Sequence, residues 1–247
     1  MVPRVRDLLC FSRPFDWRMA NAVPSGALSM EIPPDPPRTA IPGSGTFAVT
    51  RPVLYAIFFL SGVSALIYQL CWQRALLTVF GSNVESAAIV VSSFMVGLGI
   101  GSLFGGWVSE RPGLPLLLAF SLAEFIIGTF GVFSLDIFKA TAASVSGSNL
   151  AVTAAVCFLL LLLPTLFMGS TLPLLVTHHV KSMGNVGKSV SWLYFVNTLG
   201  AATGAIIAAL LLLAVFGMKT TVIIGAALNL LAAVLMFLNW LRERRAS

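Results

Sequence analysis

The chain has 247 residues, of which 57% are hydrophobic and only 10% charged, and its net charge is +6. A soluble domain carries about 25% charged residues, so this composition excludes an ordinary soluble enzyme and predicts an all-α polytopic membrane protein. The basic residues are scattered between apolar runs and do not gather with aromatic residues on one polar surface, so we expect no nucleic-acid partner.

The first 50 residues are polar and contain a proline cluster in the stretch IPPDPPRTAIPG. Because proline cannot donate a backbone hydrogen bond, we expect residues 1–50 to form a flexible cytoplasmic segment. No apolar run of signal-peptide length occurs in it. Alternatively, the arginines and aromatic residues within 1–20 could lie on the membrane surface.

Six long apolar runs follow, separated by charged residues. About 20 apolar residues are needed to cross the hydrocarbon core, so we predict a transmembrane domain over residues 51–242, followed by a basic tail, 243–247. Its helices are predicted at 53–73, 86–108, 114–135, 150–176, 190–216 and 219–241. Lys and Arg number 12 on the side of the two termini and 3 on the other. By the positive-inside rule both termini are cytoplasmic, and the compact loops suit a bacterial inner membrane.

Polar residues lie where the first helix should end and the second begin. Tyr68 and Gln69 are candidate contacts for a solute, although Tyr68 and Trp72 fit better as anchors at the membrane interface. Arg74 and Glu85 flank the short outer loop and could form an ion pair, which at a surface contributes little energy.

The second and fifth helices carry glycine at every fourth position. In the second helix these are Gly97, Gly101 and Gly105, and in the fifth they are Gly200 and Gly204. In lipid, such stripes let neighbouring helices approach closely. The two helices are three apart, as in a three-plus-three repeat. Chance is the alternative, because glycine is common in membrane helices.

Glu124 is the strongest candidate for a functional residue, because it lies midway along the third helix. A carboxylate at the bilayer centre costs about 2.5–3.5 kcal/mol on insertion scales, so something must compensate for it. It could bind a cation or a proton in a water-accessible cavity, or it could join helices through hydrogen bonds. Asn197 in the fifth helix has the same two alternatives.

The fourth helix contains Pro164, Gly169 and Pro173, and we expect these residues to kink or interrupt it. His178 and His179 follow, but adjacent histidines point in different directions and have no acidic or cysteine company, so we expect no metal site. Cys10, Cys71 and Cys157 have no metal-type spacing. No nucleophile stands with a credible base and no phosphate loop occurs, so we expect no catalytic residue and no cofactor.

Two resemblances follow from local motifs. The stretch GWVSERPG, with Gly106, Glu110, Arg111 and Gly113, resembles the cytoplasmic loop motif of major facilitator transporters. Four further stretches resemble, in order, the membrane region of fused major-facilitator/spermidine-synthase proteins: SGVSALIYQLCWQRALLTVFGS, FMVGLGIGSLFGGWVSER, LPTLFMGSTLPLL and LYFVNTLGAATGA. The resemblance implies a fold like half of a major facilitator.

Two features depart from that family. Gln69 follows Tyr68, where the family has an acidic residue, and the sequence ends six residues after Leu241, which leaves no room for an aminopropyltransferase domain. We therefore expect no enzymatic activity of that kind. The sequence favours a transporter-like module for a small, cationic, polyamine-like solute, working as a homo-oligomer or with another membrane subunit. The alternative is a non-catalytic scaffold or an anchor for a separately encoded enzyme.

Overall fold

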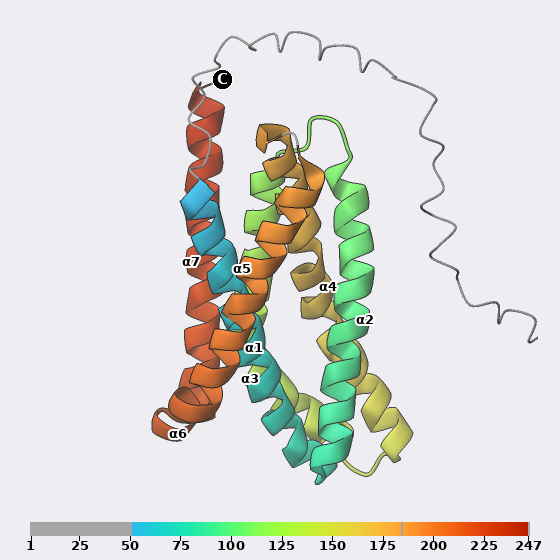
Figure 1. Cartoon of the computed structure of the whole chain (residues 1–247). Helices are drawn as coiled ribbons and strands as arrows, with labels where there is room; N and C mark the ends of the chain where they lie inside the picture. The colour runs from blue at the N-terminus through green and yellow to red at the C-terminus, as the bar shows by residue number, and fades with distance from the viewer. Residues whose placement is uncertain (1–50, 184, 247) are drawn as a thin grey trace, which may run out of the picture. The chain divides into compact units, whose positions relative to one another are not determined.

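The structure is a computed structural model that describes residues 51–183 and 185–246. The predictions for residues 1–50, including Cys10, lie outside the described residues. The described part belongs to one compact unit, Gly45–Ser247, and is all-helical (Figure 1). In chain order its elements are α1 (Arg51–Phe80), α2 (Asn83–Ser109), α3 (Leu116–Ser144), α4 (Leu150–Met183), α5 (Val186–Ile207), the π-helix η3 (Ala208–Leu212), α6 (Leu213–Val215) and α7 (Gly217–Ala246).

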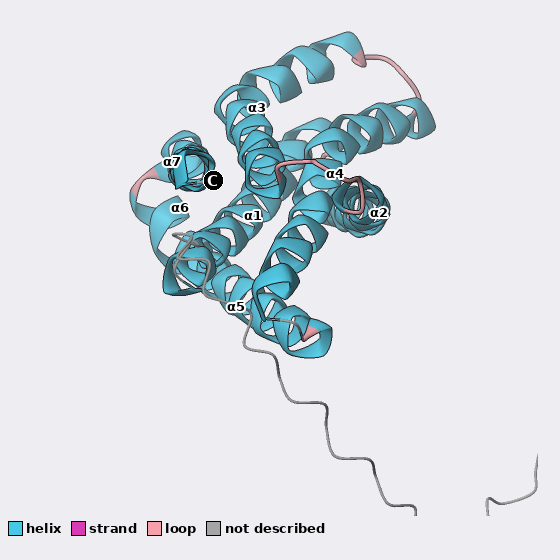
Figure 2. Cartoon of the chain, turned by 90° about the horizontal axis from the view of Figure 1, so that it is seen from above, coloured by secondary structure: helices cyan, strands magenta, loops and turns pink. Residues whose placement is uncertain are grey.

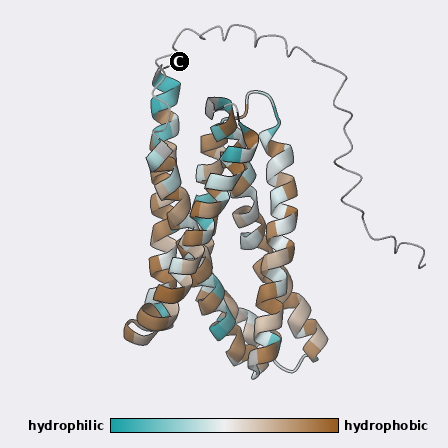
Figure 3. Ribbon diagram, in the orientation of Figure 1, coloured by the Kyte–Doolittle hydropathy of each residue, from teal (hydrophilic) through white to brown (hydrophobic). Residues whose placement is uncertain are grey.

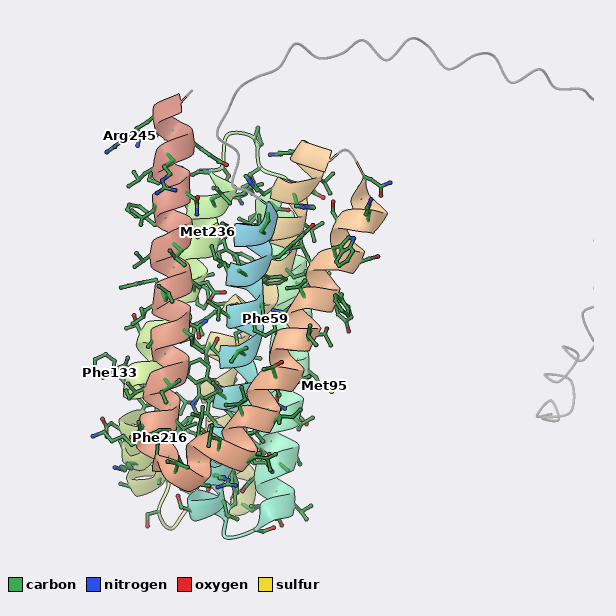
Figure 4. All side chains as sticks on the ribbon, turned by 60° about the vertical axis from the view of Figure 1, so that its left-hand side comes forward. Phe59, Met95, Phe133, Phe216, Met236 and Arg245 are labelled. Carbon is green, nitrogen blue, oxygen red and sulfur yellow. The ribbon has the colours of Figure 1, made fainter. Side chains whose placement is uncertain are left out.

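Six helices are long and apolar enough to cross a membrane, when α5, η3 and α6 are counted as one. This confirms the number of spans expected from the sequence. Apolar residues run along the helices, and polar ones are conspicuous at the end of α7 (Figure 3). Large apolar side chains such as Leu103 and Phe133 are exposed on the outside of the bundle, and Figure 4 shows Phe133 pointing away from it. A bilayer would cover such a surface at no cost.

The helices extend beyond the predicted spans. Arg74, expected to close the first helix, lies inside α1, which continues to Phe80 and ends at Gly81 with a φ of 69°. The amide of Gly81 bonds to the carbonyl of Leu77 at 2.8 Å. A charged residue marks the end of the apolar run, but the backbone keeps its helical bonds until a residue that tolerates positive φ stops it.

Of the two expected effects on the fourth helix, a kink or an interruption, the interruption is wrong. α4 is continuous over Leu150–Met183, with Pro164 and Pro173 inside it (Figure 2). The hydroxyl of Thr165 donates to the carbonyl of Leu161 at 2.9 Å, within the helical turn that precedes Pro164. Membrane helices tolerate proline because side chains and neighbouring helices satisfy the groups that it frees.

The fifth span contains a feature that the sequence analysis missed. Its last part is a π-helix, η3, before α6 and the turn at Gly217, whose φ is 70°. A π-segment inserts one residue into a helix and shifts the faces of the residues that follow. Ala208 and Leu212 at its two ends are both buried.

Glycines bring α2 and α4 into backbone contact. A Cβ added to Gly101 would lie 2.1 Å from the carbonyl oxygen of Leu166, and one added to Gly105 would lie 2.6 Å from that of Ser170. Gly169 of α4 lies in turn against the backbone of α2, so its small size serves close packing and not the predicted break. Gly97 lies at the same interface, against Thr165.

The same arrangement joins α1 and α5. A Cβ on Gly200 would lie 2.2 Å from the carbonyl oxygen of Phe59, and one on Gly204 would lie 2.3 Å from that of Val63. Gly62 of α1 lies at the same interface on the opposite helix, because a Cβ added to it would lie 2.3 Å from the carbonyl oxygen of Asn197 in α5. The residues of the two sequence stripes therefore lie at two backbone-to-backbone interfaces.

These contacts relate the first three helices to the last three. Gly62 of α1 meets α5 as Gly169 of α4 meets α2, so α1 corresponds to α4 and α2 to α5. Between α3 and α7, the Ser121 hydroxyl donates to the Ala233 carbonyl and a Cβ on Gly128 would approach the Ala226 carbonyl. This pairing of contacts among the described helices is the one that the expected three-plus-three repeat would produce.

Candidate functional site

Glu124 lies at the centre of a hydrogen-bonded group from three helices. Its side chain is fully buried in α3. Its Oε1 accepts a hydrogen bond from Ser61 Oγ of α1 at 2.6 Å, and its Oε2 accepts one from Asn229 Nδ2 of α7 at 2.5 Å. Glu124 is predicted from the sequence as a site residue, whereas Ser61 and Asn229 carry no sequence signal that predicts them.

The carboxyl group of Glu124 has no basic partner. Among the described residues, no Lys, Arg or His nitrogen lies within 4.0 Å of it. Two neutral donors offset part of the cost of burying a carboxylate, but they bring no opposite charge. The site therefore favours the arrival of a positive charge, as a proton or as a cation.

A cavity of about 400 Å³ lies beside this group, with a wall formed by α1, α2, α4 and α5 and by Asn229 of α7. Ser61 and Asn229 both line it, whereas Glu124 does not. Glu124 thus stands one layer of side chains behind the cavity wall, bonded to two residues of that wall. Helices from the first and the second half of the chain line it together, because α1 packs on α5 and α2 packs on α4 through their glycines.

Two predicted site residues lie on the same cavity. Gln69 of α1 and Asn197 of α5 both line it. Asn197 Nδ2 also donates to the carbonyl of Phe58 at 3.1 Å, which joins α5 to α1. The two roles weighed for Asn197 are therefore compatible, because one amide hydrogen bonds between helices while the side chain still borders the cavity.

Tyr68, the other predicted site residue of α1, does not border the cavity. It is fully buried, and its ring stacks on that of Trp72 with a centroid distance of 4.9 Å. The expectation that both residues anchor the chain at the membrane interface is wrong, because both are in the core. The Tyr68 hydroxyl has no hydrogen-bond partner and lies against Gly131, where a Cβ would be 2.2 Å from it.

Replacing Tyr68 with phenylalanine is expected to leave the protein as stable or to stabilise it by about 1 kcal/mol. A buried hydroxyl without a partner costs about 1–3 kcal/mol, and the ring stack on Trp72 is kept. The measurement is the midpoint of thermal unfolding in detergent. Ser134→Ala is the matched control, because Ser134 accepts the indole hydrogen bond of Trp72 at 3.1 Å and its loss should destabilise the protein.

The predicted ion pair between Arg74 and Glu85 does not form. The described residues contain an Asp136–Lys139 pair at 4.0 Å and a His178–Glu243 pair at 3.7 Å, but no pair within 4.0 Å at Arg74 or Glu85. The extension of α1 past residue 73 is the reason, because Arg74 now projects from inside a helix and not from the loop. Glu85 Oε2 is buried without a hydrogen-bond partner.

The loop motif forms a turn after α2. Glu110 caps α2, its amide approaching the Gly106 carbonyl at 3.3 Å, and Gly113 has a φ of 80°. Arg111 lies over the ring of Trp107, 3.7 Å from its centroid. Gly106 lies in the helix with open space around its Cβ position, so it makes no close contact with another described helix.

The adjacent histidines join helix ends. His179 bonds through Nε2 to the Tyr55 hydroxyl at 3.1 Å and through Nδ1 to Ser189 Oγ at 3.0 Å, while His178 contacts Glu243 of α7. The described residues hold no group of three or more His, Cys, Asp or Glu that could bind a metal ion. Cys71 and Cys157 are buried free thiols.

Comparison with known proteins relates the chain to polyamine enzymes. It is 24% identical over 229 residues to "Polyamine aminopropyltransferase 1" of Streptomyces coelicolor, a match that covers 88% of this chain and 38% of that protein. It is 24% identical over 193 residues to "Polyamine aminopropyltransferase" of Oceanobacillus iheyensis, covering 76% of this chain and 36% of that protein. No family model matches the chain, and no solved structure matches it. The chain thus spans less than two fifths of the length of these curated relatives, and the similarity is consistent with a protein related to spermidine synthases.

Proposed function

We propose that this protein is a transporter-like membrane module that binds a small solute in the cavity between α1, α2, α4 and α5. The observation that carries the proposal is the position of the cavity. It lies among helices long enough to span a membrane, polar residues from several helices border it, and Glu124 is bonded to two of them. The cavity is open where exposed residues such as Met95 and Tyr194 line it, so a solute can enter it from outside the bundle.

The arrangement of helices also supports this function. Transporter halves are built from repeats with the solute site at the repeat interface, and the cavity is lined by α1 and α2 from the first three helices and by α4 and α5 from the last three. We propose that the six helices resemble half of a major facilitator. A single half has no second body to move against, so the module works as a homodimer or with another membrane subunit.

Polyamines are the first solutes to test, because both relatives are named as polyamine aminopropyltransferases. The module would act in a bacterial inner membrane with both termini in the cytoplasm. The charge bias across the predicted loops supports this orientation.

Uptake into proteoliposomes tests the proposal. A panel of labelled amines, neutral alcohols and carboxylates is offered to liposomes that contain the protein and to empty ones. Uptake of at least one solute should depend on the protein. Thr198→Trp should reduce that uptake at least tenfold, because Thr198 lines the cavity and is exposed enough for a larger side chain to enter without disturbing the core.

Leu199→Trp is the matched control. Leu199 is the next residue of α5, is also exposed, and does not line the cavity. Equal uptake by both tryptophan variants would argue against the cavity as the solute path. No protein-dependent uptake of any solute would reject transport by this chain alone.

A scaffold or anchor for a separately encoded enzyme is the second candidate. The similarity to proteins named as enzymes supports it, because a membrane domain related to part of an enzyme could hold an enzyme at the bilayer. Purification in mild detergent separates the two functions. A stoichiometric soluble partner favours the scaffold, whereas a self-dimer whose thermal stability rises with solute favours transport.

A further inference from the structure

The buried hydroxyl groups on the cavity wall have already used their hydrogens. Ser61 Oγ donates to Glu124, Ser64 Oγ donates to the carbonyl of Ser61 at 2.8 Å, and Thr171 Oγ1 donates to the carbonyl of Met168 at 2.7 Å. A hydroxyl group has one hydrogen and two lone pairs. Toward the cavity, these three side chains can therefore only accept hydrogen bonds.

Asn229 adds a fourth acceptor, and this acceptor lacks a hydrogen-bond donor. It is 1% exposed and lines the cavity, and its Nδ2 donates to Glu124. Its Oδ1, on the other arm of the planar amide, has no hydrogen-bond partner. A buried amide oxygen without a donor costs about 1–3 kcal/mol, so this atom calls for a donor that the protein itself does not supply.

The charge of the site points the same way. Glu124 brings a carboxyl group to the wall without a basic partner among the described residues, and its two bonded neighbours are the wall residues Ser61 and Asn229. An anionic solute would meet acceptors and a like charge. A neutral alcohol could donate one hydrogen but would leave the charge unbalanced.

We propose that the buried end of this cavity recognises a primary ammonium group, which donates to Asn229 Oδ1 and to the oxygens of Ser61 and Ser64, with Glu124 as its counter-charge. An ammonium group has three donors and no acceptor, so it matches the acceptor oxygens of Ser61, Ser64 and Asn229. This inference rests on the proposed function and names the chemical class of the solute. Gln69, which is partly buried, and Tyr194, which is exposed, line the same cavity. They would contact the rest of the solute beyond its ammonium group.

Three probes of equal carbon number test the inference on the purified protein in detergent. They are 1,4-diaminobutane, 1,4-butanediol and succinate, each measured by titration calorimetry and by thermal unfolding. The diamine is expected to bind at least tenfold more tightly than the diol, and succinate is expected not to bind. Ser64→Ala should weaken diamine binding about tenfold, as expected for one hydrogen bond to a charged group.

Ser121→Ala is the matched control for Ser64→Ala. Both serines are buried in the membrane domain and donate to a backbone carbonyl, but Ser121 bonds to Ala233 and does not line the cavity. Diamine affinity should not change in Ser121→Ala. If it falls equally in both variants, the effect is one of general packing and the assignment of Ser64 is overturned.

Other outcomes overturn the ammonium assignment in distinguishable ways. Preferred binding of the diol or of succinate would reject it and would leave a solute-binding cavity, and hence the proposed function, standing. Absence of diamine binding would reject it as well, which would mean that water satisfies Asn229 Oδ1. In that case the uptake panel decides the proposed function independently, because it includes solutes of all three classes.

Discussion

Replacing Gly101 with alanine is expected to lower the free energy of unfolding by about 3 kcal/mol or to prevent folding. The added Cβ would lie 2.1 Å from the carbonyl oxygen of Leu166 and 3.0 Å from its Cα. Backbone atoms cannot rotate away as the end of a side chain can, so α2 must move off α4 along the interface that also contains Gly97 and Gly105. The measurement is the recovery of monodisperse protein in size-exclusion chromatography and the midpoint of thermal unfolding.

Gly99→Ala is the control within the same helix. Nothing lies within 4 Å of a Cβ added to Gly99, so this change adds the same methyl group outside the interface. It is expected to leave stability unchanged or to raise it by up to about 1 kcal/mol, because alanine favours a helix over glycine. Equal loss in the two variants would contradict the close approach of α2 and α4.

Replacing Glu124 with glutamine is expected to weaken binding of 1,4-diaminobutane about 100-fold while the protein still folds. The carboxylate charge is lost, which removes the counter-charge. The new amide also donates a hydrogen, and Asn229 can accept it by turning its own amide, which consumes the free Oδ1. Each loss corresponds to about tenfold in affinity, the size expected for one charged hydrogen bond. Titration calorimetry measures the affinity, and thermal unfolding without solute checks the fold.

Glu85→Gln is the matched control, because it makes the same change in charge elsewhere. Glu85 lies in the first turn of α2, is partly buried, and does not line the cavity. Its replacement should not change diamine affinity. If Glu124→Gln binds the diamine as well as the native protein does, Glu124 serves only to join α1, α3 and α7.

The sequence predicted the spans well because burial in lipid imposes a simple rule. Every crossing helix must be apolar for about 20 residues, and such runs are visible without any tertiary information. Their ends were less predictable. Arg74 and Asp136 stop the apolar pattern but not the helices, since α1 continues to Phe80 and α3 to Ser144. The interruption expected in α4 does not occur, because a helix surrounded by lipid and other helices can keep its remaining backbone bonds around a proline.

Only some residues of the candidate site could be predicted from the sequence. Glu124 was conspicuous because a carboxylate in the middle of an apolar run is costly. Ser61 and Asn229 were not conspicuous, since serine and asparagine cost little free energy in membrane helices and often occur there without a functional role. Tyr68 was grouped with the site by its nearness in sequence to Gln69, but adjacent helical residues point in different directions. Gln69 consequently borders the cavity, and Tyr68 packs on Trp72.

By itself the sequence determined that six helices are apolar enough for lipid, that glycine stripes mark two of them, and that one carboxyl group lies among apolar residues. Only the tertiary structure decided which helices those glycines bring together, which side chains bond to Glu124, and that a cavity lies on the other side of those side chains. The physical reason is that hydropathy and spacing are properties of one helix. A hydrogen bond between Glu124 and Asn229 joins residues that are 105 positions apart, and it depends on how α3 and α7 pack.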